Sequence, residues 1–119
     1  MIRNKYDVII AGGGLAGLSL ARQLKLTKSE LSILVLDKEK GPFASATHKV
    51  GESSIEIGAY YYAQILQMED YIEKEHLEKL GLRYFFNNRN KGFENRPEYG
   101  VDDFLPGKSY QFNRGTFEN

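Results

Sequence analysis

The stretch that decides the fold of this chain lies near its start, where residues 6–17 read Tyr6-Asp7-Val8-Ile9-Ile10-Ala11-Gly12-Gly13-Gly14-Leu15-Ala16-Gly17. The first six of these residues are mostly apolar and β-branched, which predicts a strand buried inside a parallel sheet. From Leu15 onward apolar residues recur at helical spacing until about Thr27. A second apolar run, residues 31–36, predicts another strand. Strand, helix and strand form a right-handed βαβ unit.

The turn between the first strand and the helix has G-x-G-x-x-G spacing. In a dinucleotide site the first glycine makes the tight turn, the second lets a pyrophosphate approach, and the third allows close helix packing. Asp37 ends the second strand, 20 residues after Gly17, where a carboxylate can accept ribose hydroxyls. We therefore predict a dinucleotide site that contains Gly12, Gly13, Gly14, Leu15, Ala16, Gly17, Asp37 and Lys38.

Two alternatives stay open on this evidence. The glycines can serve packing alone, with Asp37 as a solvated turn residue. The pattern also does not separate NAD from FAD, because both present adenosine diphosphate to the turn. Asp37 argues only against a 2′-phosphate, and the position of the motif close to Met1 is typical of FAD enzymes.

The remainder of the chain predicts further helices and strands. A helical face formed by Ile55, Ala59, Tyr62 and Leu66 follows Ser53 or Ser54, either of which can be the N-cap. A charged helix is expected from Glu69 to Leu80, followed by Gly81, and His76 would lie on its surface. Aromatic-rich strands are expected at 82–86 and 109–113, separated by a long Asn-, Gly- and Pro-bearing stretch.

Composition excludes several classes of function. The chain has 119 residues, 16 basic and 16 acidic side chains and no cysteine. Its balanced charge does not indicate a nucleic-acid partner, and no apolar run approaches the roughly 20 residues needed to span a membrane. The two histidines, His48 and His76, are too far apart to suggest a metal site. We expect a cytoplasmic protein with one domain at most.

Two further segments resemble a known family. Residues 48–54, His48-Lys49-Val50-Gly51-Glu52-Ser53-Ser54, resemble the G-E-[SA] segment of flavin-dependent halogenases and their aromatic monooxygenase relatives. The tail, residues 110–119, resembles the D-R-x-x-F-[DE] entry into a helix in that superfamily. The resemblance covers residues 6–119 and implies an α/β fold like that of p-hydroxybenzoate hydroxylase. Residues 1–81 would then begin the FAD-binding domain, and residues 82–119 would begin the substrate domain and return toward the FAD domain.

The resemblance implies FAD as cofactor and roles for five more residues. Gly51, Glu52 and Ser53 would lie near the flavin, and Arg114 would begin a helix packed over it. Lys79, in a segment similar to K-x-G-x-x-F, would handle hypohalous acid as the catalytic residue. The residues alone favour simpler roles, with Glu52 a solvated acid, Ser53 an N-cap and Lys79 part of a solvated charged helix.

The implied reaction uses a flavin hydroperoxide to halogenate or hydroxylate an organic, aromatic substrate. Its partners would be that small molecule and a separate flavin reductase. The alternatives are a reductase or hydroxylase of the same fold without halogenation, and a non-catalytic nucleotide-binding module. Complete enzymes of this family are several times longer, so we expect an amino-terminal fragment, inactive alone, that lacks the carboxyl-terminal part of the same enzyme. The W-x-W-x-I-P signature of halogenases is absent, since the chain has no Trp.

Overall fold

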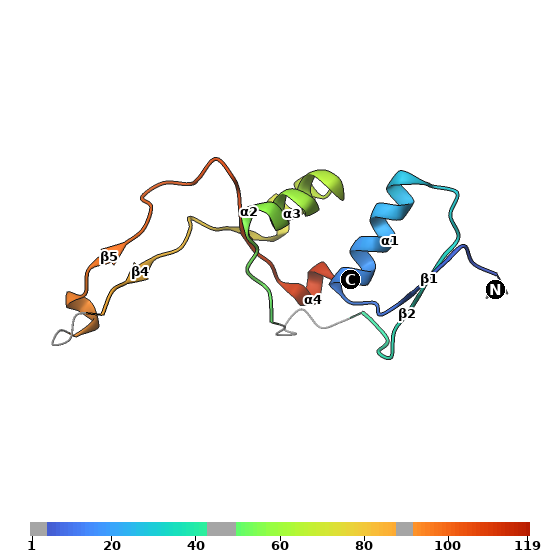
Figure 1. Ribbon diagram of the computed structural model, residues 1–119, viewed down its shortest axis with the longest axis horizontal. Helices are drawn as coiled ribbons and strands as arrows, with labels where there is room; N and C mark the ends of the chain where they lie inside the picture. Colours follow the sequence, from blue (N-terminus) through green and yellow to red (C-terminus); the bar gives the residue numbers. More distant parts are fainter. Residues whose placement is uncertain (1–4, 43–49, 88–91) are drawn as a thin grey trace.

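The computed structural model describes residues 5–42, 50–87 and 92–119. The molecule is elongated, with principal extents of 67 × 30 × 22 Å. Figure 1 shows three parts in a row, which are the amino-terminal strand and helix unit, a middle part of short helices, and a thin two-stranded arm. The candidate site residues lie in the first two parts.

The amino-terminal part is the predicted βαβ unit. Strand β1 (Val8–Ala11), helix α1 (Leu15–Thr27) and strand β2 (Ile33–Leu36) follow one another, and the two strands pair in parallel. The register runs from Val8 opposite Ile33 to Ala11 opposite Leu36. Helix α1 has the predicted bounds, whereas each strand is two residues shorter at its start than predicted. The Rossmann-like α/β class predicted from the sequence is confirmed.

One face of this sheet is covered and the other is open. Ile10 is buried beneath α1, whereas Ile9 is 60% exposed and Leu36 is 51% exposed. Successive side chains of a strand point to opposite faces, and in the described part of the chain α1 covers only one of them. The prediction of strands buried on both faces is therefore wrong for this structure.

The middle part has its own apolar core. It contains α2 (Glu56–Tyr60), the π-helix η1 (Tyr61–Ile65), α3 (Glu69–Glu75), α4 (Arg114–Phe117) and an antiparallel pair, β3 (Leu77–Glu78) with β6 (Tyr110–Gln111). The core residues are Ala59, Ile72, Tyr110 and Phe112, with Tyr62, Ala63, Met68, Tyr71 and Phe117 packed against them. The rings of Tyr62, Phe112 and Phe117 contact one another, so Tyr62 is a core residue.

The start of α2 differs from the prediction. The N-cap is Ile55, which is 64% exposed, and no side chain caps the helix. Ser54 instead accepts a 2.7 Å hydrogen bond from the N–H of Tyr110 and donates to its carbonyl. The predicted serine N-cap is therefore wrong, because pairing with β6 takes up the hydroxyl of Ser54, and Ile55 precedes the helix instead of lying on its face.

The charged helix is also shorter than predicted. Helix α3 ends at Glu75, and His76 has extended backbone angles. Leu77 and Glu78 pair with β6, and the N–H of Lys79 donates to the carbonyl of Ser109 at 2.8 Å. His76 is buried, not on a helix surface, and Lys79 is not part of a helix. Backbone pairing with a distant strand therefore overrides the local charge pattern.

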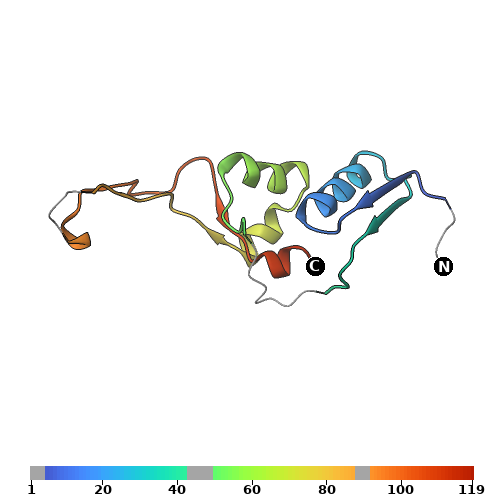
Figure 2. The same cartoon turned by 60° about the horizontal axis from the view of Figure 1, so that its bottom comes forward.

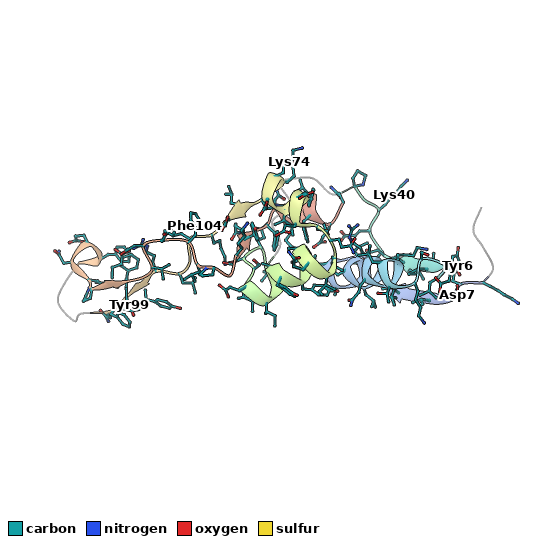
Figure 3. All side chains as sticks on the ribbon, turned by 90° about the horizontal axis from the view of Figure 1, so that it is seen from above. Tyr6, Asp7, Lys40, Lys74, Tyr99 and Phe104 are labelled. Carbon is teal, nitrogen blue, oxygen red and sulfur yellow. The ribbon has the colours of Figure 1, made fainter. Side chains whose placement is uncertain are left out.

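The arm is an antiparallel ribbon of β4 (Tyr84–Phe85) and β5 (Glu98–Tyr99), with a 3-10 turn, η2 (Phe93–Asn95), at its tip. Both predicted aromatic strands exist, as two-residue strands, but β4 pairs with β5 from a stretch for which no element was predicted. Figure 2 shows the ribbon extending away from the helices, and Figure 3 places Tyr99 and Phe104 on the far side of the molecule from Asp7 and Lys40. In the described residues, no helix has the length and apolar character needed to cross a bilayer.

Candidate nucleotide-binding site

The glycine-rich turn and Asp37 meet at one edge of the β1–β2 sheet. Because Ala11 lies opposite Leu36, the residues that follow them leave the sheet side by side. The N–H of Gly12 donates to the carbonyl of Leu36 at 2.7 Å, and the N–H of Gly13 donates to Oδ2 of Asp37 at 2.6 Å. The structure thus brings the predicted turn and acid into direct contact.

Two of the glycines are required by geometry. Gly12 has φ +118°, a conformation that other residues rarely adopt. At Gly17 an added Cβ would lie 1.9 Å from the carbonyl oxygen of Gly12, so a side chain there would force the turn away from the helix. At Gly14 an added Cβ would meet no atom of the described chain within 4 Å. Gly14 therefore leaves open space at the start of α1.

The start of α1 is suited to an anion. Its N-cap is Gly14, no side chain caps it, and its first turn contains no acidic residue. The first N–H groups of a helix have no partner within the helix and carry a partial positive charge. Phosphate groups bind at such a position in nucleotide sites.

Backbone hydrogen bonds keep the side chain of Asp37 in its charged carboxylate form. Hydrogen bonds from the N–H groups of Glu39, at 2.8 Å to Oδ1, and of Gly13 lower the pKa of its carboxyl below the usual 3.8, and the charge of Lys38 adds to this effect. Each carboxylate oxygen can accept more than one hydrogen bond. The exposed carboxylate can therefore still accept hydrogen bonds from the hydroxyl groups of a ribose.

A hollow of about 400 Å³ adjoins the turn and the acid. This volume lies within the range of roughly 300–1,000 Å³ typical of ligand pockets. Its lining comes from the glycine turn, α1, the segment after β2 and the end of the chain after α4, and consists of Gly13, Leu18, Asp37, Glu39, Gly41, Pro42, Glu118 and Asn119. Leu15, Ala16 and Lys38 are near these lining residues in the sequence but are not among them. Their roles in binding stay predictions.

A second cluster brings together the residues whose roles were implied by resemblance. The carbonyl of Glu52 accepts the N–H of Phe112 at 2.7 Å, and Ser53 forms an isolated bridge with Gln111. The half-buried Lys79 donates from Nζ to Oγ of Ser53 at 2.7 Å and to the carbonyl of Ser54 at 2.5 Å. Lys79 is therefore fixed against the Gly51-Glu52-Ser53 segment. A lysine on a solvated helix face would not make these contacts.

Arg114 joins the same cluster from the other side. It begins α4, as expected, and its Nη1 donates to the carbonyl of Val50 at 2.9 Å. Gly51, which follows Val50, has φ +88°. Nε of Arg114 donates to Oε1 of Glu118 at 2.5 Å. His48 and Lys49, which precede this segment, lie outside the described residues.

Two residues of this region were not assigned from the sequence. For Glu118 the available signal is its spacing of four residues from Arg114, which is typical of a helical ion pair. His76 stands in a run of charged residues, which predicts an exposed position and gives no local signal of burial. It lies among the rings of Tyr71, Phe112 and Phe117, and its Nδ1 accepts the N–H of Asn113 at 3.3 Å. Burial lowers the pKa of His76 below its usual value.

The parallel βαβ unit, the glycine turn and the acid at the end of β2 define a Rossmann-type dinucleotide-binding fold. A family model described as an NAD(P)-binding Rossmann-like domain matches residues 10–74, which is more than half of the chain. The chain belongs to this family.

The curated relatives include an enzyme that is named as flavin-dependent and several that are named as dehydrogenases. The chain is 41% identical over 87 residues to the flavin-dependent halogenase chlA of Dictyostelium discoideum, which covers 70% of this chain and 14% of that protein. It is 37% identical over 89 residues to the mitochondrial L-2-hydroxyglutarate dehydrogenase of Caenorhabditis elegans, which covers 73% of this chain and 19% of that enzyme. The chain thus corresponds to less than a fifth of the length of these relatives, and the predicted resemblance to flavin-dependent halogenases is confirmed.

The fold is also similar to that of a solved halogenase. The structure of halogenase PltM in complex with phloroglucinol and FAD matches 97% of this chain and 25% of its own chain, with a TM-score of 0.64 and 22% identity. A second PltM structure, with ethyl mercury and mercury, matches with a TM-score of 0.66 and 21% identity. At this identity the similarity concerns the fold alone.

Proposed function

We propose that this chain forms the adenosine-diphosphate-binding front of an FAD-dependent oxidoreductase that halogenates or hydroxylates a small aromatic substrate. The observation that carries the proposal is the contact between the Gly13 N–H and the ionised Asp37 beside the uncapped start of α1. This arrangement has donors for a pyrophosphate and acceptors for ribose hydroxyls, so the residues present fit the adenosine half of FAD.

The choice of FAD over NAD rests on the second cluster and on the relatives. Arg114 donates to the carbonyl of Val50, just before Gly51, and Lys79 donates to the hydroxyl of Ser53. These two contacts support a segment 50–53 that is fixed by side-chain hydrogen bonds rather than a solvated loop. One relative is named a flavin-dependent halogenase, and a structure with the same fold contains FAD. Bound flavin would supply two-electron redox chemistry and the activation of dioxygen.

Lys79 is the proposed catalytic residue of a halogenating reaction. Its ammonium has three N–H donors, of which Ser53 and the carbonyl of Ser54 accept two. The third can be directed at a halogen oxyacid or at a substrate hydroxyl. Held by two oxygen acceptors, the ammonium would orient such an oxidant instead of moving freely in water.

The relative named a dehydrogenase favours a second candidate, the dehydrogenation of a small hydroxy acid. This reaction would use the same nucleotide site and would not need Lys79. A non-catalytic nucleotide-binding module stays as a third outcome. The separate flavin reductase and the cytoplasmic location expected from the sequence stay predictions, as does a domain boundary after Gly81.

The natural full-length protein tests these candidates. We expect it to purify with FAD, which absorbance of the released cofactor would measure. With bromide, dioxygen as the oxidant, reduced flavin and phloroglucinol, we expect a product in which one bromine replaces one hydrogen, detected by mass spectrometry. The variant Lys79→Met should keep FAD and lose this product.

Other results would favour the alternatives. Reduction of the bound flavin by L-2-hydroxyglutarate, without any brominated product, would favour the dehydrogenase. Bound FAD with neither reaction would favour the non-catalytic module. Binding of NAD in place of FAD would contradict the proposal.

A further inference from the structure

Helix α4 connects the two halves of the candidate site. Its first residue, Arg114, contacts the segment that contains Gly51. Its C-cap, Glu118, lines the hollow beside Gly13 and Asp37, and also a smaller hollow beside Leu15. Figure 1 shows the end of α4 next to the start of α1. One turn of helix therefore spans the distance between the nucleotide turn and the Gly51-Glu52-Ser53 segment.

The carboxylate of Glu118 is buried and paired. Its side chain is 0% exposed, and that of its partner Arg114 is 14% exposed. Nε and Nη2 of Arg114 both contact Oε1 of Glu118. A carboxylate removed from water is stable only when it is paired and hydrogen-bonded. The guanidinium is thereby held in one orientation.

That orientation fixes the third contact of Arg114. Its Nη1 points at the carbonyl of Val50, 2.9 Å away, immediately before the left-handed turn at Gly51. An added Cβ on Gly51 would lie 3.4 Å from the same Nη1. Val50 itself is 98% exposed, so no packing of its own side chain holds the segment at this point.

We propose that Glu118 is a positioning residue for the flavin end of the cofactor, acting through Arg114 on the backbone of Val50 and Gly51. This inference rests on the proposed function. Glu118 does not itself hold the adenosine half, which is assigned to the glycine turn and Asp37. Loss of its charge should therefore weaken the binding of FAD more than the binding of ADP.

The test compares the affinities of the natural full-length protein for FAD and for ADP, measured by titration calorimetry on the cofactor-free form. For Glu118→Gln we expect about tenfold weaker FAD binding, because the amide keeps the shape and loses the charge that orients Arg114. ADP affinity should change by less than about twofold, well below the tenfold step of about 1.4 kcal/mol. The visible absorbance band of bound flavin should shift, which a purely structural role would not produce.

A second variant separates positioning from stability. In Arg114→Met/Glu118→Met both charges are replaced by apolar groups of similar length, a change that buried ion pairs often tolerate. We expect a melting temperature close to that of the wild type together with the same selective loss of FAD affinity. The matched control is Glu73→Met/Lys108→Met, which removes an exposed ion pair between α3 and the segment before β6 and should leave both affinities unchanged.

The outcomes distinguish this inference from the function on which it rests. If the wild type binds FAD and a folded Glu118→Gln variant has the same FAD affinity and spectrum, the inference is wrong and the function stands. Equal losses for FAD and ADP would also overturn it. If the wild type binds ADP but no FAD, the proposed function itself fails.

Discussion

The N–H of Gly13 and Oδ2 of Asp37 lie 2.6 Å apart, although the two residues are 24 positions apart in the chain. This bond closes the edge of the β1–β2 sheet and places an anion directly beside the start of α1. The acid is therefore oriented by the fold before any ligand binds. Orientation of this kind lowers the entropy that is lost on binding.

Asp37→Asn should weaken the binding of both ADP and FAD by about tenfold, because an amide accepts hydrogen bonds less strongly than a carboxylate. The pKa of Asp37 is held below its usual 3.8. The carboxylate therefore stays charged between about pH 5 and 8, and wild-type affinity should show no step from Asp37 in that range. Titration calorimetry measures both effects. The control Glu30→Gln, at an exposed site away from the turn, should bind normally. Normal binding by Asp37→Asn would remove the ribose assignment.

Alanine substitutions should separate the roles of the glycines. Gly17→Ala places a Cβ against the carbonyl of Gly12 and should lower the free energy of unfolding by about 1–3 kcal/mol. In Gly14→Ala the added Cβ meets no atom of the described residues within 4 Å, so the fold should persist while nucleotide affinity falls.

Denaturant unfolding and ADP titration together measure this pattern. The matched control is Gly58→Ala within α2, where an added Cβ also meets nothing within 4 Å in the part of the chain that the structure describes. It should raise stability by up to about 1 kcal/mol, as expected for a glycine inside a helix. A Gly17→Ala variant as stable as the wild type would contradict the packing role.

Ser53→Ala removes an oxygen that accepts from Nζ of Lys79, and leaves the carbonyl of Ser54 as its remaining partner. In a halogenating enzyme we expect the rate of product formation to fall about three- to tenfold, since bonds to charged groups are among the stronger ones. The FAD content should not change. Ser53→Thr keeps the hydroxyl and should restore most of the rate. Equal rates for the alanine and wild-type proteins would show that Ser53 does not position Lys79.

His76 should make stability depend on pH. Burial holds its pKa below the usual 6.5, so the unfolded chain binds more protons than the folded chain between these two values. Stability is complete above about pH 6.5 and should decrease as the pH falls toward the lowered pKa. Thermal unfolding at several pH values measures the decrease. His76→Asn can keep an acceptor for the Asn113 N–H but does not titrate, so its pH dependence should be smaller. An unchanged dependence would assign the effect to other groups.

The parts of the structure that were predictable from sequence are those with local causes. The glycines and Asp37 act within one βαβ unit, where strand, turn and helix follow directly in the chain, so their contact could be predicted. The bounds of α1 could be predicted because its apolar spacing is regular from Leu15 to Thr27.

The parts that could not be predicted depend on distant pairing. Residues 76–79 have the composition of a helix. Leu77 and Glu78 nevertheless form a strand, because they pair with the backbone of β6, more than thirty positions away. The same pairing buries His76 and moves Lys79 next to Ser53. Similarly, β5 is only Glu98 and Tyr99, too short for a local strand pattern, and it is defined by its pairing with β4. No local pattern contains this information.

The β4–β5 arm also determines how the chain moves through solution. The radius of gyration is 19.1 Å, whereas a compact chain of this length would have about 13.5 Å. The ribbon adds length and frictional drag with little mass. Such a particle diffuses more slowly than a sphere of equal weight and leaves a gel-filtration column early. A monomer would therefore elute where a larger globular protein is expected, and its mass should be determined by light scattering.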